Sequence, residues 1–203
     1  MTDDTRARTY HSPLRELQAQ RTRHAILEAG AQIIDEDGLV DFSMRDVAER
    51  AGVSERTVYN HFANRQALLD GLADYVDDRL RELDLQSDPR DVDDFTPRIV
   101  AIMKAFEDIG APARAMARLT TAQGTRSSAA RERTQQFRER FAHVLDRLPD
   151  NEADRAFAIL RHVVSSTTWL ALRDEFDLDP HDAAEAIGWA LDTLLRDLDG
   201  RAG

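Results

Sequence analysis

The sequence contains no cysteine and only one lysine, Lys104; all its other basic side chains are arginine. The absence of cysteine excludes disulfides, thiolate chemistry and the Cys-containing zinc sites. No stretch approaches the roughly 20 apolar residues that span a bilayer. Charges run through the first thirty residues, which is untypical of a signal peptide. We therefore expect a soluble, cytoplasmic protein with no membrane partner, no metal site and no cofactor.

Positive charge is also scarce. The chain holds 27 Lys and Arg against 38 Asp and Glu, a net charge of −11, and residues 1–70 alone hold 9 basic and 12 acidic side chains. A field of this sign repels DNA, so DNA binding would depend on locally arranged donors and helix N-termini. The acidity otherwise indicates a solvated, solubilising surface.

No segment alternates with the period of two that is typical of a β-strand. Apolar residues recur instead at helical spacing, and 42% hydrophobic content in 203 residues is enough for a core. We predict an all-α fold of about nine helices. Their expected ranges are 22–37, 44–51, 55–62, 64–83, 96–109, 112–121, 128–148, 151–176 and 180–200.

The rest of the chain is organised around residues 43–65, where two short helices flank a tight turn. Ser43 and Ser54 are good N-caps, and Gly52 suits a left-handed residue between the helices. Val58 and Phe62, four residues apart, face inward. Side chains that can contact DNA remain at the N-terminal end of the second helix or outside: Glu55, Arg56, Thr57, Tyr59, Asn60 and His61. This pattern is typical of a recognition helix.

The same run resembles the helix-turn-helix of TetR-type transcriptional regulators. The matching residues are Arg45, Val47, Ala48, Ala51, Gly52, Val53, Ser54, Thr57, Val58, Tyr59, His61, Phe62, Asn64, Arg65 and Leu68. Arg56 and Arg65 depart from the commonest residues at their positions. The motif covers about a quarter of the chain. The resemblance implies a three-helix DNA-binding domain followed by a larger helical bundle for effector binding and dimerisation.

We accordingly assign residues 1–18 to an N-terminal extension, 19–65 to DNA binding and 66–203 to effector binding and dimerisation. Leu14 and Leu17 point nearly opposite to the inward face of the following helix. Either the chain breaks near Gln20, or the extension packs on something else. The arginines of this region form either a minor-groove arm or part of a loose tail: Arg6, Arg8, Arg21 and Arg23.

The expected DNA contacts are Ser43, Arg45, Ser54, Glu55, Arg56, Thr57, Tyr59, Asn60, His61 and Arg65. Ser43, Arg45 and Tyr59 are expected to bond phosphates, which set the register of the protein on the duplex. Arg56, Thr57 and Asn60 are the candidates for base edges. Arg56 suits a bidentate contact to guanine and a phosphate contact equally. Tyr59 has an alternative interpretation, as an aromatic packed near the start of the next helix.

An effector pocket is expected between the bundle helices over residues 96–176. Its candidate lining residues are Met103, Phe106, Met116, Phe137, Phe141, His162, Ser166 and Trp169. A lining so rich in aromatic side chains and methionine favours a largely apolar effector, although each of these residues also suits a plain core.

The last helix carries two neighbouring apolar stripes, and Ala184 and Gly188 permit close helix approach. With the helix before it, it is expected to form a four-helix homodimer interface; a large monomeric bundle is the alternative. The interface candidates are Trp169, Ala184, Gly188, Leu191 and Leu195.

These observations predict a dimeric regulator, not an enzyme, that a small-molecule effector releases from a palindromic DNA operator. The rival is a helical small-molecule-binding or hydrolytic protein that no longer binds DNA. A hydroxyl run at residues 165–168 follows His162, but catalytic triads are recognised by geometry rather than by abundance. His181 and Glu185 have the spacing of a metal-binding pair, but no third ligand clusters with them.

Overall fold

The computed structural model describes residues 13–39, 42–85, 95–123 and 128–201. Every regular element within these ranges is an α-helix, which confirms the all-α prediction. The helices are α1 (Pro13–Asp37), α2 (Met44–Arg50), α3 (Glu55–His61), α4 (Arg65–Glu82), α5 (Phe95–Ile109), α6 (Ala111–Gln123), α7 (Ser128–Arg140), α8 (Ala142–Leu145), α9 (Asp150–Val163), α10 (Ser166–Asp174) and α11 (Pro180–Arg201). Among the described residues, none of these helices is both long and apolar enough to span a membrane.

Two expected helices are each divided, so these ranges hold eleven helices rather than nine. The first half of the helix expected over 151–176 ends at Val163, with Val164 as its C-cap, because Ser165 takes extended backbone angles (φ −86°, ψ 151°) and becomes the N-cap of α10. The Ser165 hydroxyl accepts the backbone N–H of Thr168 at 3.2 Å. A capping serine therefore interrupts an apolar pattern that by itself predicts one helix.

The helix expected over 128–148 is divided in the same way, into α7 and α8, at Phe141. Phe141 is fully buried, and its ring meets that of Phe95 edge-on at 4.8 Å between centroids. Helix α9 begins at Asp150, one residue before the expected start, and Pro149 is its N-cap residue.

Helix α1 is continuous over 25 residues, so of the two alternatives for this region the break near Gln20 is wrong. Its inner face is buried from Ile26 to Ile34, whereas Leu14 and Leu17 are exposed. The opposed directions of the two stripes are thus as expected. The assigned boundary between residues 18 and 19 lies inside this helix, and Arg6 and Arg8 lie outside the described residues.

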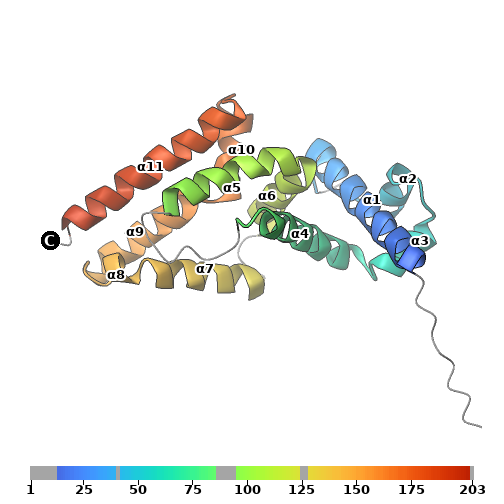
Figure 1. Ribbon diagram of the computed structural model, residues 1–203, viewed down its shortest axis with the longest axis horizontal. Coiled ribbons are helices and arrows are strands. Elements are labelled where there is room, and N and C mark those ends of the chain that lie inside the picture. Colours follow the sequence, from blue (N-terminus) through green and yellow to red (C-terminus); the bar gives the residue numbers. More distant parts are fainter. Residues whose placement is uncertain (1–12, 40–41, 86–94, 124–127, 202–203) are drawn as a thin grey trace, which may run out of the picture.

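The helix-turn-helix and the C-terminus lie at opposite ends of the elongated molecule (Figure 1). Helices α1–α3 share one hydrophobic cluster with the first half of α4, while α5 and α7–α11 build a second cluster with its other half. Helix α6 also contributes to both: Ala115 and Leu119 to the first, Ala113 and Ala117 to the second. Helices α4 and α6 are therefore the elements through which the two clusters are joined.

Candidate nucleic-acid interface

The local signals expected around the turn between α2 and α3 are present in the structure. Ser43 caps α2 by accepting the backbone N–H of Asp46 at 3.2 Å, and Ser54 caps α3 by accepting that of Thr57 at 3.1 Å. Gly52 has φ +66°, a backbone conformation that residues with a side chain rarely adopt. Short-range chemistry thus sets both helix starts and the turn between them.

One aromatic ring fixes α3 against its two neighbouring helices. Phe62, the C-cap of α3, is buried, and the Arg23 guanidinium of α1 lies 4.4 Å from its ring centroid. A Cβ on Gly71 of α4 would lie only 2.8 Å from the same ring, so glycine permits this close approach. With Val58, which is also buried, this ring holds the inner face of α3.

The outer face of α3 carries the donors. Arg56 and Asn60 are exposed, Tyr59 is 48% exposed, and Thr57 and His61 are partly buried. The exposure of Tyr59 argues against its alternative interpretation as a packed aromatic. Within the described ranges neither Arg45 nor Arg56 forms an ion pair, so their guanidinium groups are free for phosphates or base edges.

Other expected contact residues already hold the fold. Arg65 donates to the carbonyl of Leu39 at 2.5 Å, and its guanidinium lies 5.3 Å from the ring centroid of Phe42. The Ser54 and Thr57 hydroxyls bond each other at 2.7 Å, and the Ser43 hydroxyl donates to the Asp46 carboxylate. The contacts of these side chains within the chain hold α2 and α3 in place. Glu55, exposed in the first turn of α3, favours the helix dipole but repels phosphate.

The expected effector residues divide into two groups. The apolar ones share one core cluster, in which Met103, Phe106, Phe141 and Trp169 are buried and Met116 and Phe137 are partly buried. His162, in contrast, is exposed, and Ser166 is partly buried at the start of α10. The structure therefore brings the apolar set together in one buried cluster and leaves His162 at the surface.

The hydroxyl run beside His162 serves the backbone. Ser165 Oγ and Thr168 Oγ1 both donate to the carbonyl oxygen of His162, at 2.7 and 2.6 Å, and not to its ring. No group of three potential metal ligands occurs among the described residues. Glu185 accepts a hydrogen bond from Lys104 at 2.8 Å, which lowers the pKa of this carboxyl, while His181 Nδ1 lies 4.0 Å away. Neither cluster has the geometry of a catalytic or metal site.

The interface expected on α11 faces inward. Ala184 and Leu191 are fully buried, and a Cβ on Gly188 would lie 2.6 Å from the side chain of Val100 on α5 of the same chain. Trp169 is also fully buried, while Leu195 is only partly buried. The small residues of α11 let α5 pack closely within the chain, and the dimer interface stays a prediction. The outer face of α11 carries Trp189, which is 73% exposed.

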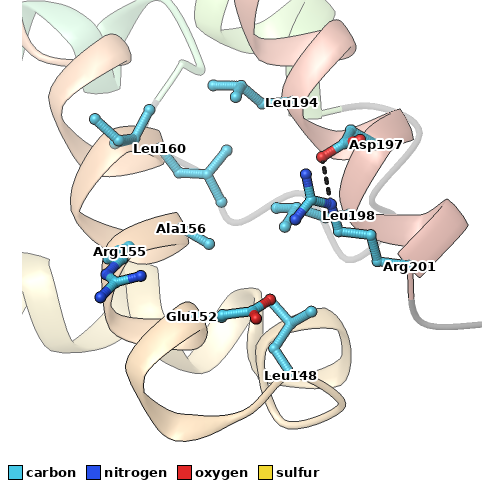
Figure 2. Close-up of a pocket in the computed structure, with 10 residues that line it drawn as sticks. Leu148, Glu152, Arg155, Ala156, Leu160, Leu194, Asp197, Leu198 and Arg201 are labelled. Atoms are coloured by element: carbon cyan, nitrogen blue, oxygen red, sulfur yellow. Dashed lines mark ion pairs between the residues drawn. The ribbon is translucent and has the colours of Figure 1, made fainter.

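A cavity of about 380 Å³ opens between α9 and α11, near the C-terminus. Ala156 and Leu160 of α9 face Leu194 and Leu198 of α11 across it (Figure 2). Its rim carries both signs of charge: Glu152 and Arg155 on α9, and Asp197 paired with Arg201 at 2.8 Å on α11. We call it the α9–α11 groove. The expected effector set contains none of its residues, although leucines four residues apart on α11 were a signal for it.

Comparison with known proteins identifies the N-terminal part. Residues 26–72 match the family model for bacterial regulatory proteins of the tetR family. The tetracycline repressor protein class A from transposon 1721 of Escherichia coli is 31% identical over 118 residues, 58% of this chain and 52% of that protein. The class C tetracycline repressor of Escherichia coli is 36% identical over 73 residues, 36% of this chain and 32% of that protein. The chain thus spans about half or less of these relatives.

Solved structures resemble nearly the whole chain. NalD, the secondary repressor of the MexAB-OprM multidrug efflux pump in Pseudomonas aeruginosa, has a TM-score of 0.60 at 24% identity, covering 88% of this chain and 96% of that one. A TetR-like transcriptional regulator from Rhodococcus sp. RHA1 has a TM-score of 0.62 at 16% identity, with the same coverage. At these identities the likeness shows a shared fold. The match over residues 26–72 identifies the helix-turn-helix part of the chain as a domain of the tetR family of bacterial regulatory proteins.

Proposed function

We propose that this chain is a DNA-binding transcriptional regulator, acting as a repressor that places α3 in the major groove of an operator. The observation that carries this proposal is the outer face of α3, where Arg56, Tyr59 and Asn60 are exposed while Val58 and Phe62 anchor the helix from within. Relatives described as repressors support it. Such a regulator acts on the chromosome, in the cytoplasm. We assign residues 19–65 to DNA binding and 66–203 to effector binding and dimerisation.

We assign the unpaired donors of α2 and α3 to two kinds of DNA contact. Arg45 on α2 and Tyr59 on α3 bond phosphates and set the register, while Arg56 and Asn60 read base edges. Ser43 and Thr57 would exchange an existing hydroxyl bond for any DNA contact, so they contribute less. The acidic remainder of the chain makes these few local donors decisive.

Replacing Arg56 with alanine is expected to relax the preference at one base pair of each half-site, by about 1–3 kcal/mol of discrimination. Affinity is measured by mobility shift, first on the DNA upstream of the chain's own coding sequence and then on single-base variants of the bound site. Arg50→Ala is the matched control, because Arg50 is held by Glu36 at 2.5 Å. An equal loss of affinity on all sequences would assign Arg56 to a phosphate instead.

The same assay over a salt series tests the function itself. Several phosphate contacts give a steep fall of affinity with salt concentration. Absence of salt-dependent binding to the upstream DNA would favour the rival, a small-molecule-binding protein without DNA affinity. The hydroxyls beside His162 lend that rival no hydrolytic site, because they bond the backbone.

We further propose that the regulator is a homodimer that buries the outer faces of α9 and α11. Ile159 on α9 is 51% exposed and Trp189 on α11 is 73% exposed, and the α9–α11 groove lies on the same two helices. A two-fold interface pairs each patch with its own copy, and a rim of both charge signs suits such pairing. Two copies of α3 related in this way would read a palindromic operator.

Replacing Trp189 with glutamate is expected to convert the dimer to monomer at micromolar concentration, because two carboxylates would enter an apolar interface. Sedimentation velocity gives the mass. Leu14→Glu is the matched control, since Leu14 is 63% exposed but lies on α1, at the other end of the molecule (Figure 1). A wild-type chain that sediments as a monomer would contradict the dimer.

A small-molecule effector would bind the core between α5, α6 and α10 and shift the protein between a DNA-competent and an incompetent state. It acts only as far as it prefers one state over the other. The apolar side chains gathered there support a largely apolar effector.

A further inference from the structure

The indole nitrogen of Trp169 is buried without a hydrogen-bond partner. Its side chain is fully buried, and among the described residues Nε1 is the one buried side-chain nitrogen or oxygen left unpaired. A buried tryptophan N–H normally finds an acceptor, because burying it unpaired is unfavourable. The position therefore calls for an acceptor that the described part of the chain does not supply.

The surroundings of Trp169 restrict what that acceptor is. The Phe106 ring lies 5.4 Å away at 61°, and Met103 of α5 and alanines of α6 belong to the same cluster. No charged or polar residue is buried in the described part of the chain. A charged ligand would lie there without a counter-charge, whereas an uncharged molecule with one acceptor oxygen would satisfy the indole and bury its remaining surface against hydrocarbon.

We infer that the Trp169 Nε1–H donates to a carbonyl or ether oxygen of an uncharged, largely apolar effector, which enters the core between α5, α6 and α10. This inference rests on the proposed function and names the chemistry of its effector. It also assigns the indole a role that packing alone does not require, since phenylalanine would fill similar space without an unpaired N–H.

The site is well placed to influence the helix-turn-helix. Asp174, at the end of the helix that carries Trp169, bonds Arg118 of α6 at 3.0 Å. Arg118 also bonds Asp35 of α1 at 3.3 Å. A ligand that separates α10 from α6 therefore disturbs the hydrogen bonds that link Asp174 through Arg118 to Asp35 on α1.

The test uses tetralin and 1-tetralone, two probes of nearly the same shape of which only the second has a carbonyl. The full-length ¹⁵N-labelled chain has two indole cross-peaks, and Trp169→Phe identifies the buried one by its loss. We expect 1-tetralone to shift this cross-peak downfield. The ratio of 1-tetralone to tetralin affinity, measured by calorimetry, should fall about tenfold in Trp169→Phe, because one hydrogen bond to the carbonyl is lost. The free energy of moving each probe out of water is the same for both variants and cancels in the comparison.

Phe106→Leu is the matched control: it alters the packing beside the indole but keeps the N–H, so both affinities should change alike. An unchanged ratio in Trp169→Phe would overturn the inference, as would a cross-peak that no probe moves, which would indicate an internal water or no acceptor at all. Failure of both probes to bind at their solubility limit would overturn it too. The readout needs no DNA, so a failed mobility shift of the wild-type chain would count separately, against the proposed function.

Discussion

Replacing Phe62 with alanine is expected to lower the free energy of unfolding by about 3–5 kcal/mol and to abolish binding to the upstream DNA. The ring is buried and lies under the Arg23 guanidinium. It packs against Gly71 of α4, where any side chain would clash with it. Its loss opens a cavity where α1, α3 and α4 meet, so α3 loses its orientation as well as stability. Urea denaturation followed by circular dichroism, with mobility shift, measures both effects.

Tyr59→Ala separates the two effects, because Tyr59 lies three residues away on the outer face of the same helix. It is 48% exposed, so its removal is expected to change stability by less than about 1 kcal/mol. It should nevertheless weaken DNA binding through the lost phosphate contact. If Tyr59→Ala destabilised the chain as much as Phe62→Ala, or left DNA affinity intact, the assignment of inner and outer faces of α3 would be wrong.

The helix-turn-helix could be predicted from sequence because its determinants are local. Ser43 and Ser54 each cap a helix through the N–H three residues later, and Gly52 relieves backbone strain at its own position. None of these depends on a distant residue. The inward direction of Val58 and Phe62 follows from helical spacing alone.

Partners distant in sequence could not be predicted in this way. Arg65 matches a contact position of the family, yet one of its N–H groups is used by Leu39, 26 residues earlier. Helix α11 offered two apolar stripes, and only the position of Val100 on α5 decides that the stripe with Gly188 is buried within the chain. Ser166 was expected to line the pocket, because nothing in the apolar pattern marks the end of α9 at Val163.

The contact between α6 and α1 could likewise not be predicted from sequence, although it joins the two hydrophobic clusters. Asp35 of α1 accepts from Arg114 Nε at 2.7 Å and from Arg118 Nε at 3.3 Å. Its side chain is only 15% exposed, whereas both arginines are about a third exposed. One carboxylate thus holds two guanidinium groups, about 80 residues away in sequence, against the helix that carries the DNA-binding end.

Replacing Asp35 with alanine is therefore expected to destabilise the chain by about 1–3 kcal/mol, less than for a fully buried pair because water screens the arginines. It should also uncouple the two clusters. Both tryptophans, Trp169 and Trp189, lie in the bundle, so their fluorescence reports on that part alone, while circular dichroism reports on all helices. The wild-type urea transitions should coincide, and the Asp35→Ala transition by circular dichroism should begin at lower urea than that by fluorescence.

Asp37→Ala is the matched control, because Asp37 is an exposed carboxylate on the same helix. Coincident transitions in Asp35→Ala, or an equal separation in Asp37→Ala, would show that α6 and α1 are coupled by apolar packing and not by this carboxylate.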